Sequence, residues 1–234
     1  MEQATPTPKT FVVVPAYNEG EVLASVLATI RAEGFPCVVV DDGSHDDTYA
    51  IASAQGCQVL RHIINRGQGA ALRTGIEFCL RAGAEVIVTF DSDGQHRIND
   101  VWRMLDTLRE RRVDVVLGSR FLAQQDGSMP RTRRLVLKLG ILFTRLTSGL
   151  RLSDTHNGLR VLSRRAAKEI RLRQDRMAHA SELLEEIGRL KLSYCEVATT
   201  VAYTPYSKSK GQSSGAALRI VWELLMARMG RERT

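Results

Sequence analysis

The stretch CVVVDDGSHDDT, residues 37–48, decides the fold class because it holds a strand, a turn and the start of a helix. Its first four residues are apolar and mostly β-branched, which favours a short buried strand. A Gly-Ser pair then allows a tight turn, and Asp46 or Asp47 is a suitable N-cap for a helix over 46–54. A strand that turns directly into a helix is half of a βαβ unit.

The same alternation extends over the first half of the chain. The short apolar runs are FVVV (11–14), CVVV (37–40), CQVL (57–60), VIVTF (86–90) and DVVLG (114–118). Segments with apolar residues at helical spacing lie between them, over 19–32, 46–54, 69–81 and 98–110. This rhythm predicts an α/β fold of repeated βα units around a mostly parallel central sheet.

The length of 234 residues, 44% of them hydrophobic, suits one well-buried domain and is too short for two of typical size. We expect a flexible tail over 1–10, a single domain over 10–215 and a C-terminal amphipathic helix over 216–234. Within the domain, residues 182–191 have helical spacing and 194–203 have the composition of a strand.

A basic amphipathic stretch, PRTRRLVLKLGILFTRLTSGLR, covers residues 130–151. Its mixture of cations with an apolar face suits a helix that lies on a membrane surface or on a hydrophobic ligand. A core helix with cationic side chains along its edge would show the same pattern. The sequence leaves both interpretations open.

The composition narrows the classes of partner. A net charge of +7 favours nucleic acid, an anionic membrane or a phosphorylated substrate. Aromatic residues are not interleaved with the basic runs, which argues against nucleic acid. The four cysteines form no C-x-x-C pair, as expected of reduced cytosolic thiols. No segment approaches the roughly 20 apolar residues of a transmembrane helix, so we expect a cytoplasmic protein that is soluble or peripheral on the membrane.

Polar signatures directly follow four of the predicted strands. They are PAYNEG (15–20), DDGSHDD (41–47), DSDGQH (91–96) and SRF (119–121). Because ligands of open α/β sheets bind at the carboxyl ends of the strands, these four signatures predict one composite site.

Asp91 and Asp93 are the candidate metal ligands. Two residues apart on extended backbone, their side chains would point to the same face and converge on one hard cation. Mg²⁺ or Mn²⁺ would take the remaining ligands from water and substrate phosphate. Such triplets are often solvated turns, but the position after a buried strand favours the metal.

Asp41 and Asp42 follow their strand without a gap. They could belong only to a turn and a helix cap, or one carboxylate could accept hydrogen bonds from a nucleobase or ribose. We favour the second, because a turn does not require two consecutive acids. The glycines of NRGQGAALRTG (65–75) lack the G-x-x-x-x-G-K-[ST] pattern, so we do not expect an ATPase.

Five motifs, VVVPAYNE, VVVDDGSHDDT, NRGQGAALRTGI, DSDGQH and GSRF, resemble in this order those of the family 2 inverting glycosyltransferases. The resemblance is strongest over 10–165 and greatest to the dolichol- or polyprenyl-phosphate mannosyl- and glucosyltransferases. It implies a GT-A fold, a Rossmann-like three-layer arrangement, and a nucleotide-sugar donor of the GDP-mannose or UDP-glucose type.

The resemblance also implies roles for individual residues on the donor side. The nucleotide would contact Pro15, Tyr17, Glu19, Asp42 and Asp91. The metal ion on the diphosphate, Mg²⁺ or Mn²⁺, would be held by Asp91, Asp93 and Gln95. There it would neutralise the leaving nucleoside diphosphate.

On the acceptor side, the resemblance implies that Arg120, Arg133 and Lys210 bind the acceptor phosphate. A guanidinium suits this task because its rigid fork meets phosphate oxygens in pairs. Asp154, in DTHNGLR (154–160), matches a family D-x-x-x-G segment and is expected near the reacting centre, although a structural turn is the alternative. Asp93, Arg120 and Asp154 are thus the expected catalytic residues.

The acceptor decides whether a general base is needed. A lipid monophosphate is already anionic and needs none, whereas a sugar hydroxyl must lose a proton to a carboxylate or histidine. His96, His156 and His179 stand in no context that requires a catalytic role.

The sequence therefore predicts transfer of a sugar from a nucleotide-sugar donor to a polyprenyl-phosphate acceptor, on the cytoplasmic face of a membrane or beside a small membrane protein. The alternatives are transfer to a sugar or glycan hydroxyl and a non-catalytic nucleotide-sugar or nucleic-acid binding module. The intact Asp91 and Asp93 pair argues against the non-catalytic module. The sugar, the base and the oligomeric state stay open.

Overall fold

The structure is a computed structural model that describes residues 9–122, 145, 148–155 and 157–202. Residues 1–8 of the predicted tail, the predicted C-terminal helix and most of the basic stretch 130–151 lie outside the described residues, whereas Thr10, the last residue of the predicted tail, begins the first strand. Three of the candidate residues, Arg133, His156 and Lys210, also lie outside the described residues. Among the described residues, no helix combines the length and apolar character needed to cross a bilayer.

A seven-stranded sheet runs through the described part of the chain. Its strands are β1 (Thr10–Ala16), β2 (Cys37–Asp41), β3 (Gln58–Arg61), β4 (Val86–Thr89), β5 (Val115–Ser119), β6 (Arg160–Ser163) and β7 (Tyr194–Ala198). They lie in the order β3-β2-β1-β4-β6-β5-β7. The pairs are parallel except where β6 runs antiparallel to both β4 and β5.

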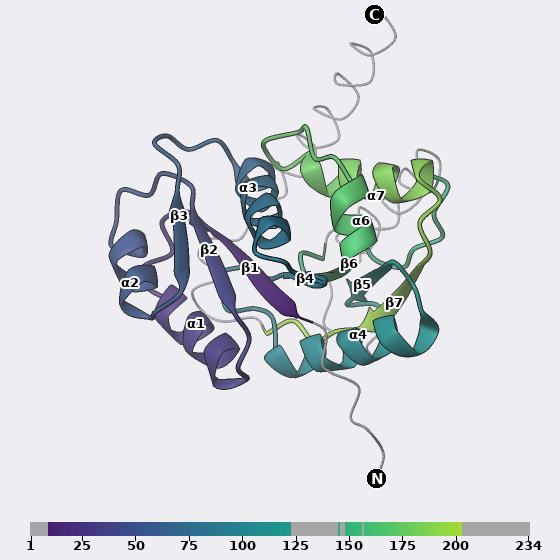
Figure 1. Cartoon of the computed structure of the whole chain (residues 1–234), viewed down its shortest axis with the longest axis horizontal. Coiled ribbons are helices and arrows are strands. Elements are labelled where there is room, and N and C mark those ends of the chain that lie inside the picture. Colours follow the sequence, from purple (N-terminus) through teal and green to yellow (C-terminus); the bar gives the residue numbers. More distant parts are fainter. Residues whose placement is uncertain (1–8, 123–144, 146–147, 156, 203–234) are drawn as a thin grey trace, which may run out of the picture.

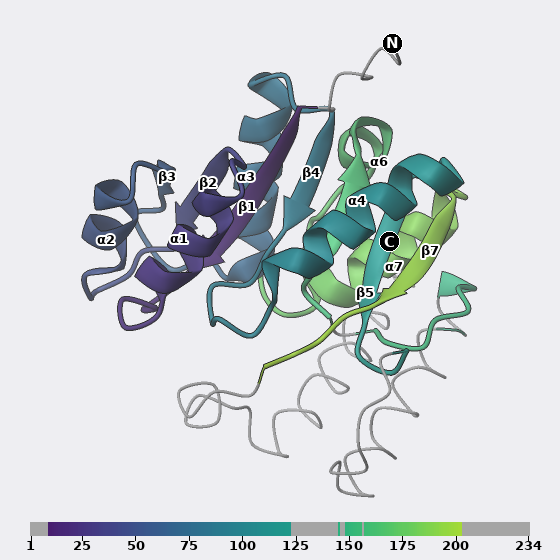
Figure 2. The same ribbon diagram turned by 90° about the horizontal axis from the view of Figure 1, so that it is seen from below.

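Helices cover both faces of this sheet and make the fold three-layered (Figure 1). They are α1 (Leu23–Ala32), α2 (Thr48–Ala54), α3 (Gln68–Arg81), α4 (Ile98–Arg111), α6 (Arg164–Glu169) and α7 (His179–Arg189). The view from below shows α1 and α4 in front of the sheet (Figure 2). The other face carries α3, α6 and α7, whose apolar residues form a separate core cluster.

Alternation along β1 shows how the two cores divide the side chains. Phe11 and Val13 belong to the cluster under α3, whereas Val12 and Val14 belong to the cluster under α1. Because both faces are covered, the strand reads as an unbroken apolar run. Gly75 of α3 brings this helix close to the sheet, since a Cβ there would collide with Val13.

The five strands predicted from apolar runs are all present, and the predicted α/β fold with a mostly parallel central sheet is confirmed. Two predicted strands are shorter in the structure. The strand expected over 86–90 ends at Thr89, and the one expected over 194–203 ends at Ala198. Asp91 and Asp93 therefore lie beyond the end of the strand, and Asp93 lies in a turn, so the two side chains do not share one stretch of extended strand as predicted.

Candidate active site

The loops after the parallel strands meet at one edge of the sheet, as the four polar signatures predict. The loop after β1 is tied to the loop after β2, because the Asn18 amide donates to Ser44 Oγ and the His45 amide donates to Asn18 Oδ1, both at 2.9 Å. The start of α3 contacts the loop after β4 through a hydrogen bond from Gln68 Nε2 to Asp91 Oδ1 at 3.0 Å. One continuous polar edge results.

The end of β1 and the loop after it contain three of the candidate nucleotide ligands. Pro15 is buried in β1, one residue before the strand ends. The ring of Tyr17 is exposed at this edge. The amide of Glu19 donates to Thr48 Oγ1 at 2.9 Å, which fixes the loop against the start of α2.

Asp42 is buried and organises the loop that leads from β3 into α3. Its Oδ1 accepts from the Arg66 amide at 3.0 Å and lies 2.6 Å from His62 Nδ1, and its Oδ2 accepts from the Gly67 amide at 2.6 Å. The other ring nitrogen of His62 lies 3.0 Å from Thr74 Oγ1. The Asp42 carboxylate therefore fixes residues 62–67 at the edge of the predicted nucleotide pocket, and its contact with a base stays a prediction.

The neighbouring acid, Asp41, has different partners. It is fully buried, accepts a hydrogen bond from the Ser44 amide at 3.0 Å and pairs with Arg61 Nε at 3.0 Å. The helix cap belongs to a third acid, since Asp46 Oδ1 accepts from the Thr48 amide at 3.0 Å, whereas Asp47 makes no side-chain cap bond. Two consecutive acids are therefore present because one shapes the turn and the other holds the next loop.

Asp91 lies among polar and basic groups. Besides Gln68, its carboxylate contacts His96 Nε2 at 3.0 Å, and its side chain is 27% exposed. Burial raises the pKa of Asp91, but the hydrogen bond and charge of His96, together with Arg160 and His179, outweigh it and hold the pKa below its usual range. Asp91 is therefore an anion ready for a cation.

The pKa of Asp93 is shifted in the opposite direction, above its usual range. Its burial and the negative charge of Asp91 both raise the pKa of Asp93, while the Gln95 amide donates to its Oδ1 at 3.0 Å. Gly94, with φ of +73°, makes the turn that brings this amide back. Two carboxylates that repel each other at a strand end form a suitable pair of donors for a hard divalent cation.

The donor set fits a metal ion that is completed by substrate. Among the described residues, no group of three His, Cys, Asp or Glu could hold a metal ion by itself. Asp91 and Asp93 would therefore supply two ligands, and Gln95, phosphate oxygens and water the rest. Gly158 makes room for this arrangement, because a Cβ at this position would collide with the Asp91 carboxylate.

Arg120 and Asp154 form the second half of the site. Arg120 Nε and Nη2 donate to the two oxygens of Asp154 at 2.7 and 2.8 Å, and the Arg120 amide adds a third bond at 3.1 Å. Glu196 of β7 accepts from the amides of Ser153 and Asp154 and so fixes the acidic partner. The Asp154 side chain is completely buried, so it acts on the site through Arg120.

Arg160 connects the two halves, and sequence reasoning missed it. This buried residue begins β6, donates from Nε to the Asn157 carbonyl at 3.1 Å and interacts electrostatically with both Asp91 and Asp154. The signal was present, because Arg160 is the last residue of the DTHNGLR segment from which only Asp154 was selected. The Arg160 guanidinium thus interacts with one acid of each half of the candidate site, Asp91 and Asp154.

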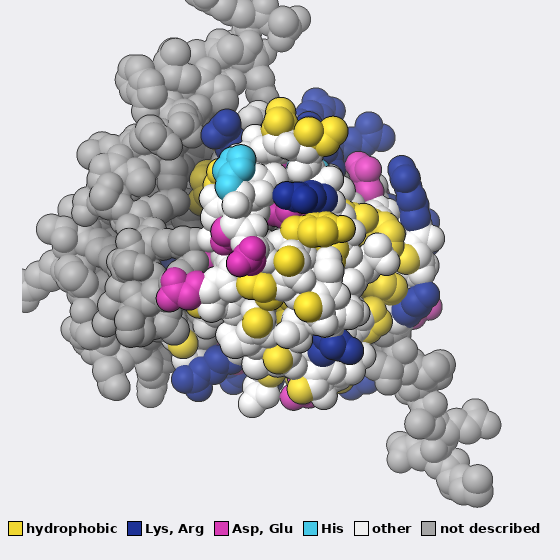
Figure 3. Space-filling view, turned by 90° about the vertical axis from the view of Figure 1, so that its left-hand side faces the viewer, with side chains coloured by type: hydrophobic (Ala, Val, Ile, Leu, Met, Phe, Trp, Pro, Cys, Tyr) yellow, Lys and Arg dark blue, Asp and Glu magenta, His cyan; other side chains and the backbone are white. Residues whose placement is uncertain are grey.

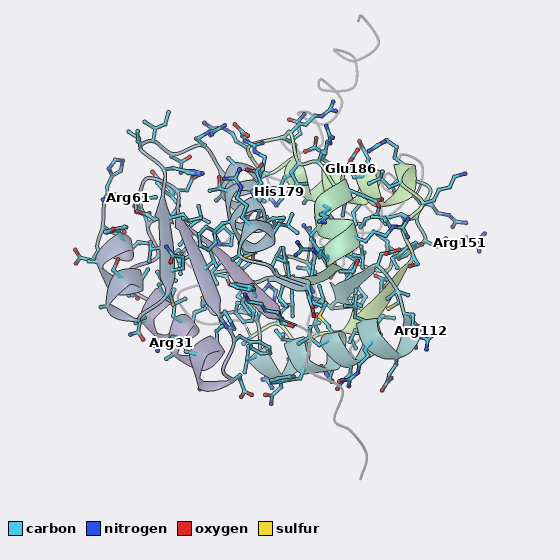
Figure 4. All side chains as sticks on the ribbon, viewed as in Figure 1. Arg31, Arg61, Arg112, Arg151, His179 and Glu186 are labelled. Atoms are coloured by element: carbon cyan, nitrogen blue, oxygen red, sulfur yellow. The ribbon has the colours of Figure 1, made fainter. Side chains whose placement is uncertain are left out.

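His179 is buried in the first turn of α7, which lies beside α3 (Figure 4). Its Nδ1 lies 2.8 Å from the Arg176 carbonyl, to which it donates. Burial and then the charge of Arg160 lower the pKa of His179 to about 4. It is therefore a neutral side chain at physiological pH that shields the cluster around Asp91.

The chain is similar to known proteins of one family. Residues 11–171 match the model of the family described as glycosyl transferase family 2. The chain is 32% identical to the UDP-N-acetylglucosamine–dolichyl-phosphate N-acetylglucosaminyltransferase of Methanococcus voltae, over 94% of this chain and 96% of that protein. It is also 32% identical to the polyprenol monophosphomannose synthase of Mycolicibacterium smegmatis, over 71% of this chain and 66% of that protein.

A solved structure shares the fold. Glucosyl-3-phosphoglycerate synthase from Mycobacterium tuberculosis, in complex with Mn²⁺, UDP and glucosyl-3-phosphoglycerate, superposes with a TM-score of 0.68 at 21% identity. The match covers 95% of this chain and 80% of that one. The predicted resemblance to the polyprenyl-phosphate sugar transferases is thus confirmed, and the chain belongs to glycosyl transferase family 2 and is a glycosyltransferase.

Proposed function

We propose that this protein is a metal-dependent inverting glycosyltransferase that moves a sugar from a nucleotide sugar to a polyprenyl phosphate. One observation carries the proposal. Asp91 and Asp93 follow the end of β4, and the Arg120–Asp154 ion pair lies at the end of β5, on the same edge of the sheet. The first pair suits a cation on a leaving diphosphate, and the second suits an anionic acceptor.

Donor binding uses the edge formed by the first two loops. Tyr17 and Glu19 would contact the nucleotide, and Asp42 would fix residues 62–67 beside it. Mg²⁺ or Mn²⁺, held by Asp91, Asp93 and Gln95, would supply positive charge to the leaving nucleoside diphosphate. The M. tuberculosis synthase, solved with Mn²⁺ and UDP, supports this assignment.

Acceptor binding would use the guanidinium of Arg120. Asp154 fixes its plane through two parallel hydrogen bonds, so the orientation presented to phosphate oxygens is set before the acceptor arrives. We therefore assign Asp154 a positioning role in catalysis. Arg133 and Lys210 remain proposed ligands of the same phosphate on the strength of the sequence.

The state of the candidate bases favours a phosphate acceptor over a hydroxyl. Asp154 accepts from Arg120 with both oxygens, His96 contacts the proposed metal ligand Asp91, and His179 donates to a carbonyl. The partners of Asp154 and His96 would compete with a hydroxyl proton, and the pKa of His179, lowered to about 4 by burial, makes it a weak base. A lipid monophosphate brings its own anionic oxygen and needs no such base.

A matched acceptor screen tests the proposal. Purified full-length protein would be incubated with Mn²⁺ and with GDP-mannose, UDP-glucose or UDP-N-acetylglucosamine. Each donor would be offered a short-chain polyprenyl phosphate or the corresponding polyprenol, and products read by mass spectrometry. We expect a glycosylated lipid phosphate that disappears in EDTA; transfer to the polyprenol or to a free sugar, with none to the phosphate, would establish the hydroxyl acceptor instead.

The site of action would be the cytoplasmic face of a membrane, reached at the lipid surface or beside a small membrane protein. The relatives named for dolichyl and polyprenyl acceptors support this part of the proposal.

A further inference from the structure

The loop between β3 and α3 exposes two adjacent apolar side chains. Ile63 is 100% exposed and Ile64 is 69% exposed, more than any other large hydrophobic residue among those described. This loop projects beyond the end of β3 at the upper left of Figure 1. A single exposed apolar residue is ordinary, but two consecutive isoleucines that are both largely exposed to water mark a contact surface.

The exposure is built into the fold, because the backbone on both sides of the isoleucines is fixed. The His62 amide donates to the Asp41 carbonyl at 2.9 Å, and the amides of Arg66 and Gly67 donate to Asp42. The backbone of Ile64 also packs on Gly43, where a Cβ would lie 2.8 Å from the Ile64 carbonyl carbon. These contacts hold Ile63 and Ile64 outward.

Cations flank the apolar tip. Arg61 precedes it, with a half-exposed side chain that pairs with Asp41 and lies over the ring of Tyr49 at 4.8 Å. Arg66 follows it, also half-exposed, and pairs with Asp175 at 3.2 Å. Arg61 lies at the outer edge of the sheet in Figure 4, and hydrophobic and basic side chains adjoin along the upper border of Figure 3.

We propose that Ile63 and Ile64 insert into the interfacial region of an anionic lipid bilayer, with Arg61 and Arg66 at the headgroups. A bilayer accepts a small projecting apolar tip framed by cations. A protein partner is disfavoured, because a stable interface needs about 800 Å² from each side, far more than two side chains supply.

The insertion would bring the site to its lipid acceptor, and this benefit rests on the proposed function. The tip follows the carboxyl end of β3, at the same edge of the sheet as Asp91 and Arg120. A loop anchored in the bilayer would therefore bring this edge to the surface where a polyprenyl phosphate lies. The attachment itself can be measured without any transfer reaction.

Vesicle binding of the full chain tests the attachment. Partition onto vesicles of phosphatidylcholine and phosphatidylglycerol should fall about tenfold or more in the Ile63→Ser, Ile64→Ser double variant, from the apolar area lost. The matched Ile63→Leu, Ile64→Leu variant keeps this area and should bind as the parent does. Equal binding of the serine variant and the parent would overturn the proposal.

A soluble reaction separates this inference from the proposed function. Transfer by the parent to a short-chain polyprenyl phosphate in buffer without vesicles tests the proposed function alone, and equal circular dichroism and thermal unfolding of the parent and the serine variant show that the variant folds. If the parent fails to transfer but the serine variant still loses vesicle binding, the proposed function fails and the membrane tip stands.

A tryptophan at position 63 reports the environment of the tip directly. The Ile63→Trp variant should emit as an exposed indole in buffer, beyond the signal of Trp102 and Trp222 in the parent. With vesicles of brominated lipid its added emission should shift to the blue and be quenched. Blue emission before vesicles are added would mean that another part of this chain or a second copy covers the tip, and would overturn the proposal.

Discussion

Arg120 and Asp154, 34 residues apart in the sequence, form a bidentate ion pair with donor–acceptor distances of 2.7 and 2.8 Å. The carboxylate is completely buried and the guanidinium is 16% exposed. The Asp154 carboxylate therefore lies beneath the Arg120 guanidinium, which reaches toward the edge of the sheet. Asp154 thus supports Arg120 from beneath. In the proposed function, Arg120 would contact the acceptor phosphate and Asp154 would only orient Arg120.

Replacement of Asp154 by alanine should lower the free energy of unfolding by about 3 kcal/mol, because a mostly buried guanidinium loses its carboxylate. The acceptor kcat/KM should fall about 100-fold, since Arg120 is no longer oriented, while the donor KM changes little. Denaturant unfolding and acceptor titration measure these effects. The control is Asp106→Asn, whose exposed pair with Arg109 should contribute about 0.5 kcal/mol or less.

Asp91→Asn and Asp93→Asn should both reduce transfer at least about 100-fold, because the metal ion would stabilise the leaving charge by several kcal/mol. Their stabilities should differ. Asp93→Asn removes the repulsion that raises the pKa of Asp93 and should leave the protein at least as stable. Asp91→Asn removes the anion facing His96 and Arg160 and should lower the melting temperature. Full activity in EDTA would contradict the metal assignment.

Asp42→Ala should weaken binding of the free nucleoside diphosphate, with or without metal, because residues 62–67 lose the acceptor of two amides. Calorimetry measures the affinity, and limited proteolysis reports release of the loop. Unchanged affinity together with faster cleavage would restrict Asp42 to holding the loop and exclude its contact with the base.

His179 should make stability depend on pH. Its pKa is about 4 in the folded protein against 6.5 as the ordinary value, so the unfolded chain binds more protons between these limits. Stability should therefore fall as the pH drops from 6.5 toward 4, by at most about 3 kcal/mol. Thermal unfolding at several pH values should show a shallower loss in His179→Asn; parallel curves for the two proteins would refute the assignment.

Cys57 should be the most readily alkylated of the described cysteines. A hydrogen bond with Cys37 lowers the pKa of the partly exposed Cys57 thiol to about 7, against burial and aided by Arg31. Burial raises the pKa of Cys79 to about 12. Labelling by iodoacetamide should rise through pH 7 and map to Cys57 by mass spectrometry; a rise only above pH 8 would contradict this.

The features predicted correctly from the sequence are those that a short local pattern encodes. The apolar runs identified five strands because each is covered on both faces, and the acids at their ends identified the site because parallel strands end together. Prediction failed for β6, whose four residues begin with the charged Arg160 and give no periodic signal. The antiparallel pairing of this strand depends on the fit between β4 and β5, which no local pattern records.

Long-range contacts were equally hidden. Nothing near Asp42 in the sequence indicates that its acceptors serve amides 24 and 25 residues later. The turn at Asp93 was also wrongly predicted to be extended, because the end of a buried strand depends on its neighbours. Thr89 is the last residue of β4, and it pairs with Arg160.

The reversed direction of β6 has an evolutionary consequence. Because β5 ends and β6 begins at the same edge, the segment that joins them leaves and re-enters the sheet beside the site. Its length is not constrained by the distance across the sheet, so insertions and deletions there need not move the donor loops. Under the proposed function, changes in this one segment would alter the acceptor without displacing the residues at the ends of β1, β2 and β4.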